Sequence, residues 1–159
     1  MSMLLDLLDE AFDRKSWHGP NLWASIRGVR AQEAAWRPGP GRHNIWELVL
    51  HAAYWKYVVR RRLTGEKRGS FVLAGSNFFE RPEGDPSQAA WKADTAILLR
   101  QHQQLRVAIA QLSLAERTAL ETVPQTARLI RGIAAHDLYH AGQIRLLRRL
   151  SGSGRRAPN

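Results

Sequence analysis

The sequence contains no cysteine among its 159 residues. Disulfides, thiolate-bound metals and cysteine nucleophiles are therefore excluded, and any metal site must use His, Asp or Glu side chains. The chain also lacks an apolar run of about 18 residues, so we expect no membrane span. Asp6 interrupts the first leucines and no basic segment precedes them. We therefore expect no secretory signal and a cytoplasmic location.

Acidic residues are few, with 14 Asp and Glu against 24 Lys and Arg, and the formal net charge is +10. Such a charge is compatible with an acidic partner such as nucleic acid. The basic residues are dispersed, however, and clusters at residues 60–62 and 148–149 precede Gly65 and Gly152. Cations at those positions complement the negative end of a helix dipole. Nucleic-acid binding is therefore an alternative that only the charge supports.

No segment alternates between apolar and polar residues with a period of two, whereas the helical period of 3.6 recurs along the chain. The expected helices span residues 2–16 with a continuation over 21–29, then 45–64, 85–112 and 126–150. This pattern predicts an all-α four-helix bundle within residues 1–150, with short extra helical turns in the connections. Residues 151–159 read as a flexible basic C-terminal tail.

Start and stop signals define the second main helix most sharply. Asn44 is a candidate N-cap, Glu47 three residues later completes a capping-box pattern, and Gly65 ends the helix. The third helix is expected to begin with Asp85 as N-cap and Pro86 at its first position. The connection over residues 66–84 carries Phe71, Phe78 and Phe79, which indicates that it packs onto the bundle.

His136 and His140 are the strongest functional candidates, because residues at i and i+4 project from the same side of a helix. Two imidazoles placed in this way can bind one metal ion, although the spacing alone also suits two surface histidines with ordinary hydrogen bonds. The small residues Ala134, Ala135, Ala141 and Gly142 flank the pair, which favours a position facing another helix.

His51 is the candidate third ligand, because apolar residues surround it in the second main helix. A core histidine satisfied by one hydrogen bond is the alternative. Three histidines meeting in a core without a metal would each need partners for two nitrogens, which is costly. Glu47, one turn before His51, suits either a hydrogen bond that orients the imidazole or the capping role.

The other candidates carry weaker expectations. His43 could cap the second main helix or contact a substrate, His102 is expected on the outer face of the third helix, and Asp137 points away from His136 and is not expected to be a ligand. His18 is expected in a turn or at the bundle end, and Trp46, Trp55 and Trp91 are expected in the core and not at a cofactor. Tyr139 and Gln143 could reach the rim of the site, with core packing of Tyr139 and surface exposure of Gln143 as the alternatives.

Two stretches resemble the DinB-like (DinB/YfiT) metal-binding four-helix bundle family. They are residues 46–51 (WELVLH) and residues 132–144 (GIAAHDLYHAGQI), of which the closing YHAGQI is the most specific part. Residues 17–20 (WHGP), 35–38 (AWRP) and 63–65 (LTG) also fit. The resemblance covers most of residues 3–150.

The resemblance implies a metal bound by one histidine of the second main helix and two of the fourth, which here are His51, His136 and His140. It also implies nickel or zinc, a homodimer and a small-molecule substrate. Characterised members include thiol-cofactor-dependent S-transferases and a mycothiol-dependent isomerase, and some members carry a hydrolase label. A specific activity does not follow, because one fold hosts several chemistries.

Our leading hypothesis is that the metal lowers the pKa of a low-molecular-weight thiol and presents the thiolate to an electrophile. The Phe71–Phe79 loop would cover an apolar substrate, and nearby arginines would bind carboxylates of the thiol. The second enzyme hypothesis is hydrolysis by metal-activated water, for which Glu47 is the one acidic residue that we can place near a ligand. The third is a non-catalytic metal- or nucleic-acid-binding helical protein.

Overall fold

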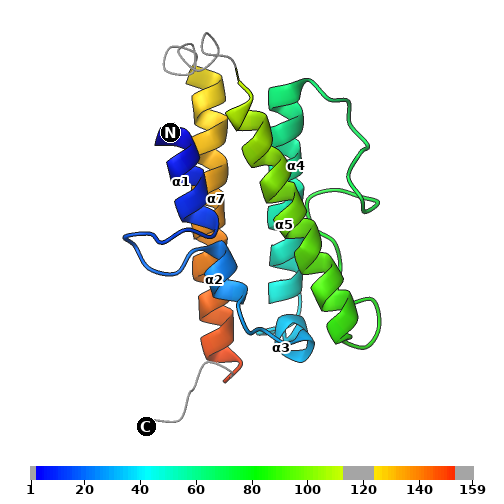
Figure 1. Ribbon diagram of the computed structural model, residues 1–159. Coiled ribbons are helices and arrows are strands. Elements are labelled where there is room, and N and C mark those ends of the chain that lie inside the picture. Colours follow the sequence, from blue (N-terminus) through cyan, green and yellow to red (C-terminus); the bar gives the residue numbers. More distant parts are fainter. Residues whose placement is uncertain (1–2, 113–123, 153–159) are drawn as a thin grey trace.

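Four helices form a bundle in the computed structural model, which describes residues 3–112 and 124–152 (Figure 1). They are α1 (Met3–Phe12), α4 (Ile45–Thr64), α5 (Gln88–Ala110) and α7 (Pro124–Leu150). α4 packs against α5 and α7, and α1 packs against α7 and α5, which closes the ring. No β-strand occurs in the described ranges. The predicted all-α bundle is confirmed.

Two short helices occupy the connection between α1 and α4. α2 (Leu22–Ile26) packs against α7, and α3 (Ala31–Ala35) packs against α4 and α5 (Figure 1). These are the extra helical turns expected between the main helices. Asn21 caps α2, because its side-chain oxygen accepts a hydrogen bond from the backbone N–H of Ala24 at 3.0 Å.

Both end signals of α4 act as predicted. The Asn44 side chain accepts a hydrogen bond from the backbone N–H of Glu47 at 2.8 Å, which satisfies one of the free donors of the first turn. Gly65 ends the helix with φ 73°, a left-handed conformation that glycine adopts without steric cost. These two ends fix which residues of α4 face the interior.

Several predicted boundaries were wrong by a few residues. The first helix ends at Phe12 and not at residue 16, and α2 ends at Ile26 and not at residue 29. α5 begins at Gln88, because Ser87 and not Asp85 is its N-cap. α7 begins at residue 124, two residues early. The proposed cap at residue 2, most of the expected connector over 113–125 and residues 153–159 of the tail lie outside the described residues.

The core consists of two apolar clusters that lie at different levels of the bundle. One cluster includes Trp46 and Leu50 of α4 and Ile144 of α7, and the other includes Val59 of α4 and Ile133 of α7. Along α7, His136 and His140 therefore fall between the two clusters. The bundle positions a polar site at the junction of two well-packed regions.

The connection between α4 and α5 packs onto the bundle through its aromatic residues, as predicted. Phe79 is buried, and Phe71 and Phe78 are partly buried against the first core cluster. Arg81 anchors the end of this connection, because its backbone carbonyl accepts from the Asn44 side chain at 2.6 Å and its Nε donates to Asp94 at 2.9 Å. The connection thereby reaches the site.

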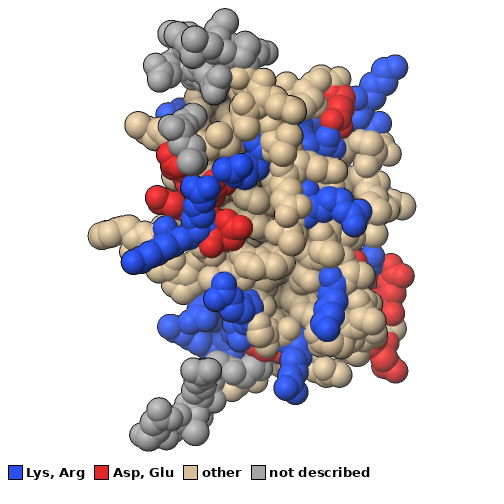
Figure 2. Space-filling view, in the orientation of Figure 1, with Lys and Arg blue, Asp and Glu red and all other residues tan. Residues whose placement is uncertain are grey.

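The charge distribution agrees with the expectation from the sequence on the face that Figure 2 presents. Lys and Arg side chains lie there among uncharged and acidic residues and do not gather in one strip. Among the helices of the described ranges, none is long and apolar enough to cross a membrane.

Candidate metal centre

Three imidazoles converge between α4 and α7. The Nε2 atoms of His51 and His140 each lie 3.1 Å from Nε2 of His136, and one ligand atom from each residue lies within 4.8 Å of the others. Three nitrogens bound at about 2.0–2.1 Å to a tetrahedral ion are separated by about 3.3 Å. The observed spacing is close to that edge length, so the structure brings together the three residues that the sequence predicts as ligands.

Hydrogen bonds at Nδ1 fix the tautomers of two imidazoles. His51 Nδ1 lies 2.9 Å from the backbone carbonyl oxygen of Asn77, and His140 Nδ1 lies 2.7 Å from Oε1 of Gln143. Gln143 presents its oxygen to His140, since its Nε2 donates to the Tyr139 hydroxyl at 3.1 Å. Because an oxygen of this kind only accepts, each Nδ1 carries the proton and each Nε2 presents a lone pair.

His136 supplies the third nitrogen, but the hydrogen bonds among the three histidines do not satisfy all of their ring nitrogens. Its Nδ1 is buried without a hydrogen-bond partner. Its Nε2 can donate one proton to one neighbour at most, so at least one pair of facing Nε2 lone pairs has no proton between them. A cation at the meeting point removes that repulsion. The donor set therefore fits a divalent ion that accepts neutral imidazoles.

Burial keeps the group unprotonated. Burial, together with repulsion from His140 and His51, lowers the pKa of His136 to about 3. Burial and the neighbouring His51 lower the pKa of His140 to about 4. Burial also lowers the pKa of His51, although the hydrogen bond to Asn77 acts in the opposite direction. All three imidazoles are therefore neutral near pH 7, which is the form that binds metal ions.

The connection between α4 and α5 covers His51. Asn77 adopts φ 67°, a left-handed conformation that asparagine tolerates better than most residues. Its side-chain oxygen accepts a hydrogen bond from Trp55 Nε1 at 3.0 Å, while its backbone carbonyl holds His51. The ring of Phe78 stacks between His51, at 4.0 Å, and His43, at 3.7 Å. This loop orients one imidazole and shields it from solvent.

Glu47 does not contact His51. Its carboxylate accepts hydrogen bonds from Arg37 Nη1 at 3.0 Å and from His43 Nδ1 at 2.8 Å. Although burial alone would raise the pKa of Glu47, these hydrogen bonds outweigh it and the pKa is lowered. Glu47 therefore forms neither of the two hydrogen bonds considered from the sequence, one to the imidazole of His51 and one to the backbone N–H of the N-cap residue. His43 does not cap α4, because Asn44 does.

A buried ion pair joins α4 and α7 next to the triad. Lys56 Nζ contacts Asp137 Oδ2, and both side chains are fully buried. Asp137 points to Lys56 and is not part of the histidine cluster, and its Oδ1 has no hydrogen-bond partner. Lys56 also lies over the ring of Phe12, 4.8 Å from its centroid.

His102 lies inside the bundle, which corrects the expectation of an outer-face residue. Its ring stacks on Phe12 at 3.7 Å, and Nδ1 is buried without a partner. Burial, together with the positive charges of Lys56 and Arg106, lowers the pKa of His102 to about 2. The sequence signal was present, because Leu98 and Leu105 place residue 102 on the apolar side of α5.

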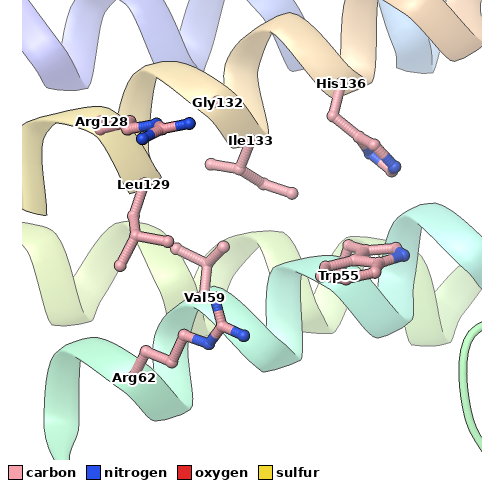
Figure 3. A pocket seen from close by; sticks show the side chains of 8 residues that line it. All are labelled: Trp55, Val59, Arg62, Arg128, Leu129, Gly132, Ile133 and His136. Atoms are coloured by element: carbon pink, nitrogen blue, oxygen red, sulfur yellow. The ribbon is translucent and has the colours of Figure 1, made fainter. Parts of the chain in front are cut away.

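Trp55 is the exception among the three tryptophans assigned to the core. Trp46 and Trp91 are buried, whereas Trp55 is partly exposed and lines a cavity that ends at His136 (Figure 3). Sequence reasoning missed this role, as it missed Asn77. The residue pair Ser76 and Asn77 after Gly75 indicates a turn, but no local pattern relates that turn to His51.

The fold and the triad define an all-α bundle with a candidate metal centre between facing helices. The model of the DinB superfamily matches residues 15–144, and the chain belongs to this superfamily. No curated protein and no solved structure matches the chain. Superfamily membership and the buried histidine cluster together support metal binding.

Proposed function

We propose that this protein is a metal-dependent enzyme in which His51, His136 and His140 hold a nickel or zinc ion. The single observation that supports the proposal is the convergence of three Nε2 atoms, two of them with their tautomers fixed by Nδ1 hydrogen bonds. Three neutral imidazoles would leave the ion its full charge, so that it would lower the pKa of a thiol at an open coordination position.

The proposed reaction is the transfer of a low-molecular-weight thiol to an electrophilic carbon of a small molecule. The sulfur forms a bond to that carbon, the leaving group departs with its bonding electron pair, and the thiol proton passes to water. Trp55 and Phe78 flank the triad and would limit the access of bulk water, while the cavity at His136 would hold the reactants.

Hydrolysis is the less favoured chemistry, because it profits from a carboxylate base beside the attacking water. The cluster of side chains in the described ranges that could hold a metal ion consists of three histidines and contains no carboxylate. The carboxylate of Glu47 is held by Arg37 and His43, and that of Asp137 is held by Lys56. Neither is free to act as a base at the triad.

A homodimer is part of the proposal. Tyr139, Leu146 and Leu150 are more than half exposed, at 64%, 57% and 58%. Their spacing of seven and four residues places them on one face of α7. An exposed apolar stripe of this kind suits a second copy of the chain. Sedimentation of the wild type as a dimer, and of Leu146→Glu as a monomer, would support this assignment, whereas a monomeric wild type would exclude it.

The metal assignment has a direct test. Protein purified without chelators should contain about one nickel or zinc ion per chain by elemental analysis. His140→Ala should abolish the metal content while the helical circular dichroism persists, and His18→Ala, in an exposed turn, should retain the metal. Full metal retention in His140→Ala would contradict the site.

The reaction is tested with 1-chloro-2,4-dinitrobenzene as the electrophile, with and without cysteine, glutathione or coenzyme A. Thiol-dependent release of chloride that is lost in His140→Ala supports the transferase. Cleavage of p-nitrophenyl acetate that needs no thiol, with no thiol-dependent chloride release, would favour the hydrolase instead.

A further inference from the structure

A cavity of about 410 Å³ lies between α4 and α7 and ends at His136. Its volume falls within the range of small-molecule sites, about 300–1,000 Å³. Figure 3 shows His136 and Trp55 at one end and the guanidinium groups of Arg62 and Arg128 toward the other. His136 is partly exposed, whereas His51 and His140 are buried. The cavity therefore connects the proposed metal centre to a basic end.

The middle of the cavity is apolar. Val59 and Ile133 are buried members of the second core cluster, and Leu129 packs against them. These side chains offer no hydrogen bonds, so they favour an alkyl or aryl segment of a ligand over a polar one. Gly132 lines the same wall and adds no side chain to it.

Among the described residues, the far end of the cavity is cationic and contains no acidic side chain that could act as a counterion. Its described lining residues include the two basic side chains Arg62 and Arg128. Neither arginine forms a hydrogen bond or ion pair with another residue in the described part of the chain, unlike Arg60, which pairs with Glu66. Two guanidinium groups left without partners are suited to bind an anion, because each presents a fork of N–H donors.

Helix stability explains only one of these arginines. Arg62 lies in the last turn of α4, where a cation complements the helix dipole. Arg128 is the fifth residue of α7, close to its N-terminal end, and there the dipole favours an anion. The dipole effect falls off within the first turn, so it does not stabilise a cation at the fifth residue. A ligand anion between the two helices would give both guanidinium groups a partner.

We propose that this cavity binds the substrate as an elongated organic anion. Its carboxylate or phosphate would lie between Arg62 and Arg128, its apolar segment would contact Val59, Leu129 and Ile133, and its reactive end would reach His136. The role of the His136 end rests on the proposed metal-dependent function, whereas anion binding at the two arginines does not.

Binding of eight-carbon probes tests the proposal. Octanoate, octyl phosphate, octan-1-ol and octylamine are titrated into the full-length protein by calorimetry, with and without prior chelator treatment. Octanoate should bind once per chain, at least about tenfold more tightly than octan-1-ol, because its carboxylate accepts charge-assisted hydrogen bonds from the two guanidinium groups. Octylamine should bind most weakly. Tighter binding of octyl phosphate than of octanoate would assign the anion to phosphate esters, and the reverse order to carboxylates.

Single substitutions distinguish anion binding by Arg62 and Arg128 from attraction by the overall positive charge of the protein. Arg62→Gln and Arg128→Gln should each weaken octanoate binding by about tenfold and leave octan-1-ol unchanged. Arg131→Gln is the matched control, because Arg131 is exposed on the same helix and does not line the cavity. An equal loss in Arg131→Gln, or equal affinity for octanoate and octan-1-ol, would overturn the proposal.

The same measurements distinguish failure of the proposed metal centre from failure of the proposed anion site. If the purified protein contains no metal but octanoate binds through Arg62 and Arg128, the anion site stands and the metal-dependent function fails. If the protein contains metal but octanoate does not bind, the metal centre stands and the anion site fails.

Discussion

At the scale of single residues, the triad depends on which nitrogen of each imidazole carries the proton. A carbonyl oxygen at Nδ1 of His51 and an amide oxygen at Nδ1 of His140 direct both Nε2 lone pairs inward. Such hydrogen bonds raise the basicity of a ligand and hold its ring in place. Gln143 and Asn77, neither of which touches the meeting point of the Nε2 atoms, therefore contribute to its geometry.

Gln143→Leu should weaken metal binding by about 10–100-fold, because His140 loses the acceptor that fixes its tautomer. Gln143→Glu keeps an acceptor at the same position and should retain the wild-type affinity or exceed it. Competition with a chromophoric chelator measures both affinities. Equal affinity of the leucine variant and the wild type would show that the hydrogen bond is unimportant.

The backbone conformation of Asn77 should also affect metal binding, because its carbonyl oxygen holds His51. Asn77→Ala and Asn77→Gly both remove the hydrogen bond to Trp55, but only alanine is strained at φ 67°, by about 1–2 kcal/mol. The carbonyl that holds His51 should therefore loosen in the alanine variant. We expect weaker metal binding for alanine than for glycine in the same chelator competition. The opposite order would be evidence against a role for the backbone conformation.

The histidines show how far the sequence could predict such a site. Helical periodicity predicted that His136 and His140 lie one turn apart on one side of a helix. His51 was a candidate from its apolar surroundings, and the family resemblance implied the complete triad. Their role as ligands stays a prediction. Asn77 could not be predicted, because the path of a long connection depends on tertiary contacts such as those of Arg81.

At the scale of the helices, the Lys56–Asp137 pair sets α4 against α7 one residue from His136. Burial raises the pKa of Asp137 to about 6 even though Lys56 acts to lower it. Burial likewise lowers the pKa of Lys56, against the attraction of Asp137. Each charge is acceptable in the interior only because the other is present. Helical periodicity places Asp137 away from the site but cannot identify Lys56 as its partner.

We expect substitutions of Lys56 and Asp137 to have strongly non-additive effects on the free energy of unfolding. Lys56→Met and Asp137→Leu should each lower the free energy of unfolding by about 3–5 kcal/mol, because each leaves one buried charge unpaired. The double variant should cost much less than the sum of the two. Urea unfolding measures all three variants and the wild type. Additive losses in the double variant would contradict the pairing. Glu83→Gln is the control, because Glu83 lies in a surface ion pair, and it should lower the free energy of unfolding by about 1 kcal/mol or less.

At the scale of the whole molecule, the bundle buries neutral histidines inside a strongly cationic protein. His51, His102, His136 and His140 all have lowered pKa values, because burial disfavours their charged form. Below their ordinary pKa of 6.5, the unfolded chain therefore binds more protons than the folded chain does. The resulting stability is present above about pH 6.5 and is lost as the pH falls below it. Metal-free protein should accordingly become less stable between pH 6.5 and pH 4.

The contribution of a single histidine to this pH dependence of stability can be measured at His102. This residue lies apart from the triad, and burial lowers its pKa to about 2. Between pH 6 and pH 4, removing it should reduce the slope of stability against pH by up to about 1.4 kcal/mol per pH unit. Urea unfolding of chelator-treated wild type and His102→Leu over this range measures the two slopes, whatever the absolute stability of the variant. Proton NMR of the folded wild type should show no titration of the His102 ring down to pH 4. Equal slopes in the two proteins, or a titrating ring, would mean that His102 is protonated in the folded state and that the bundle does not keep it neutral.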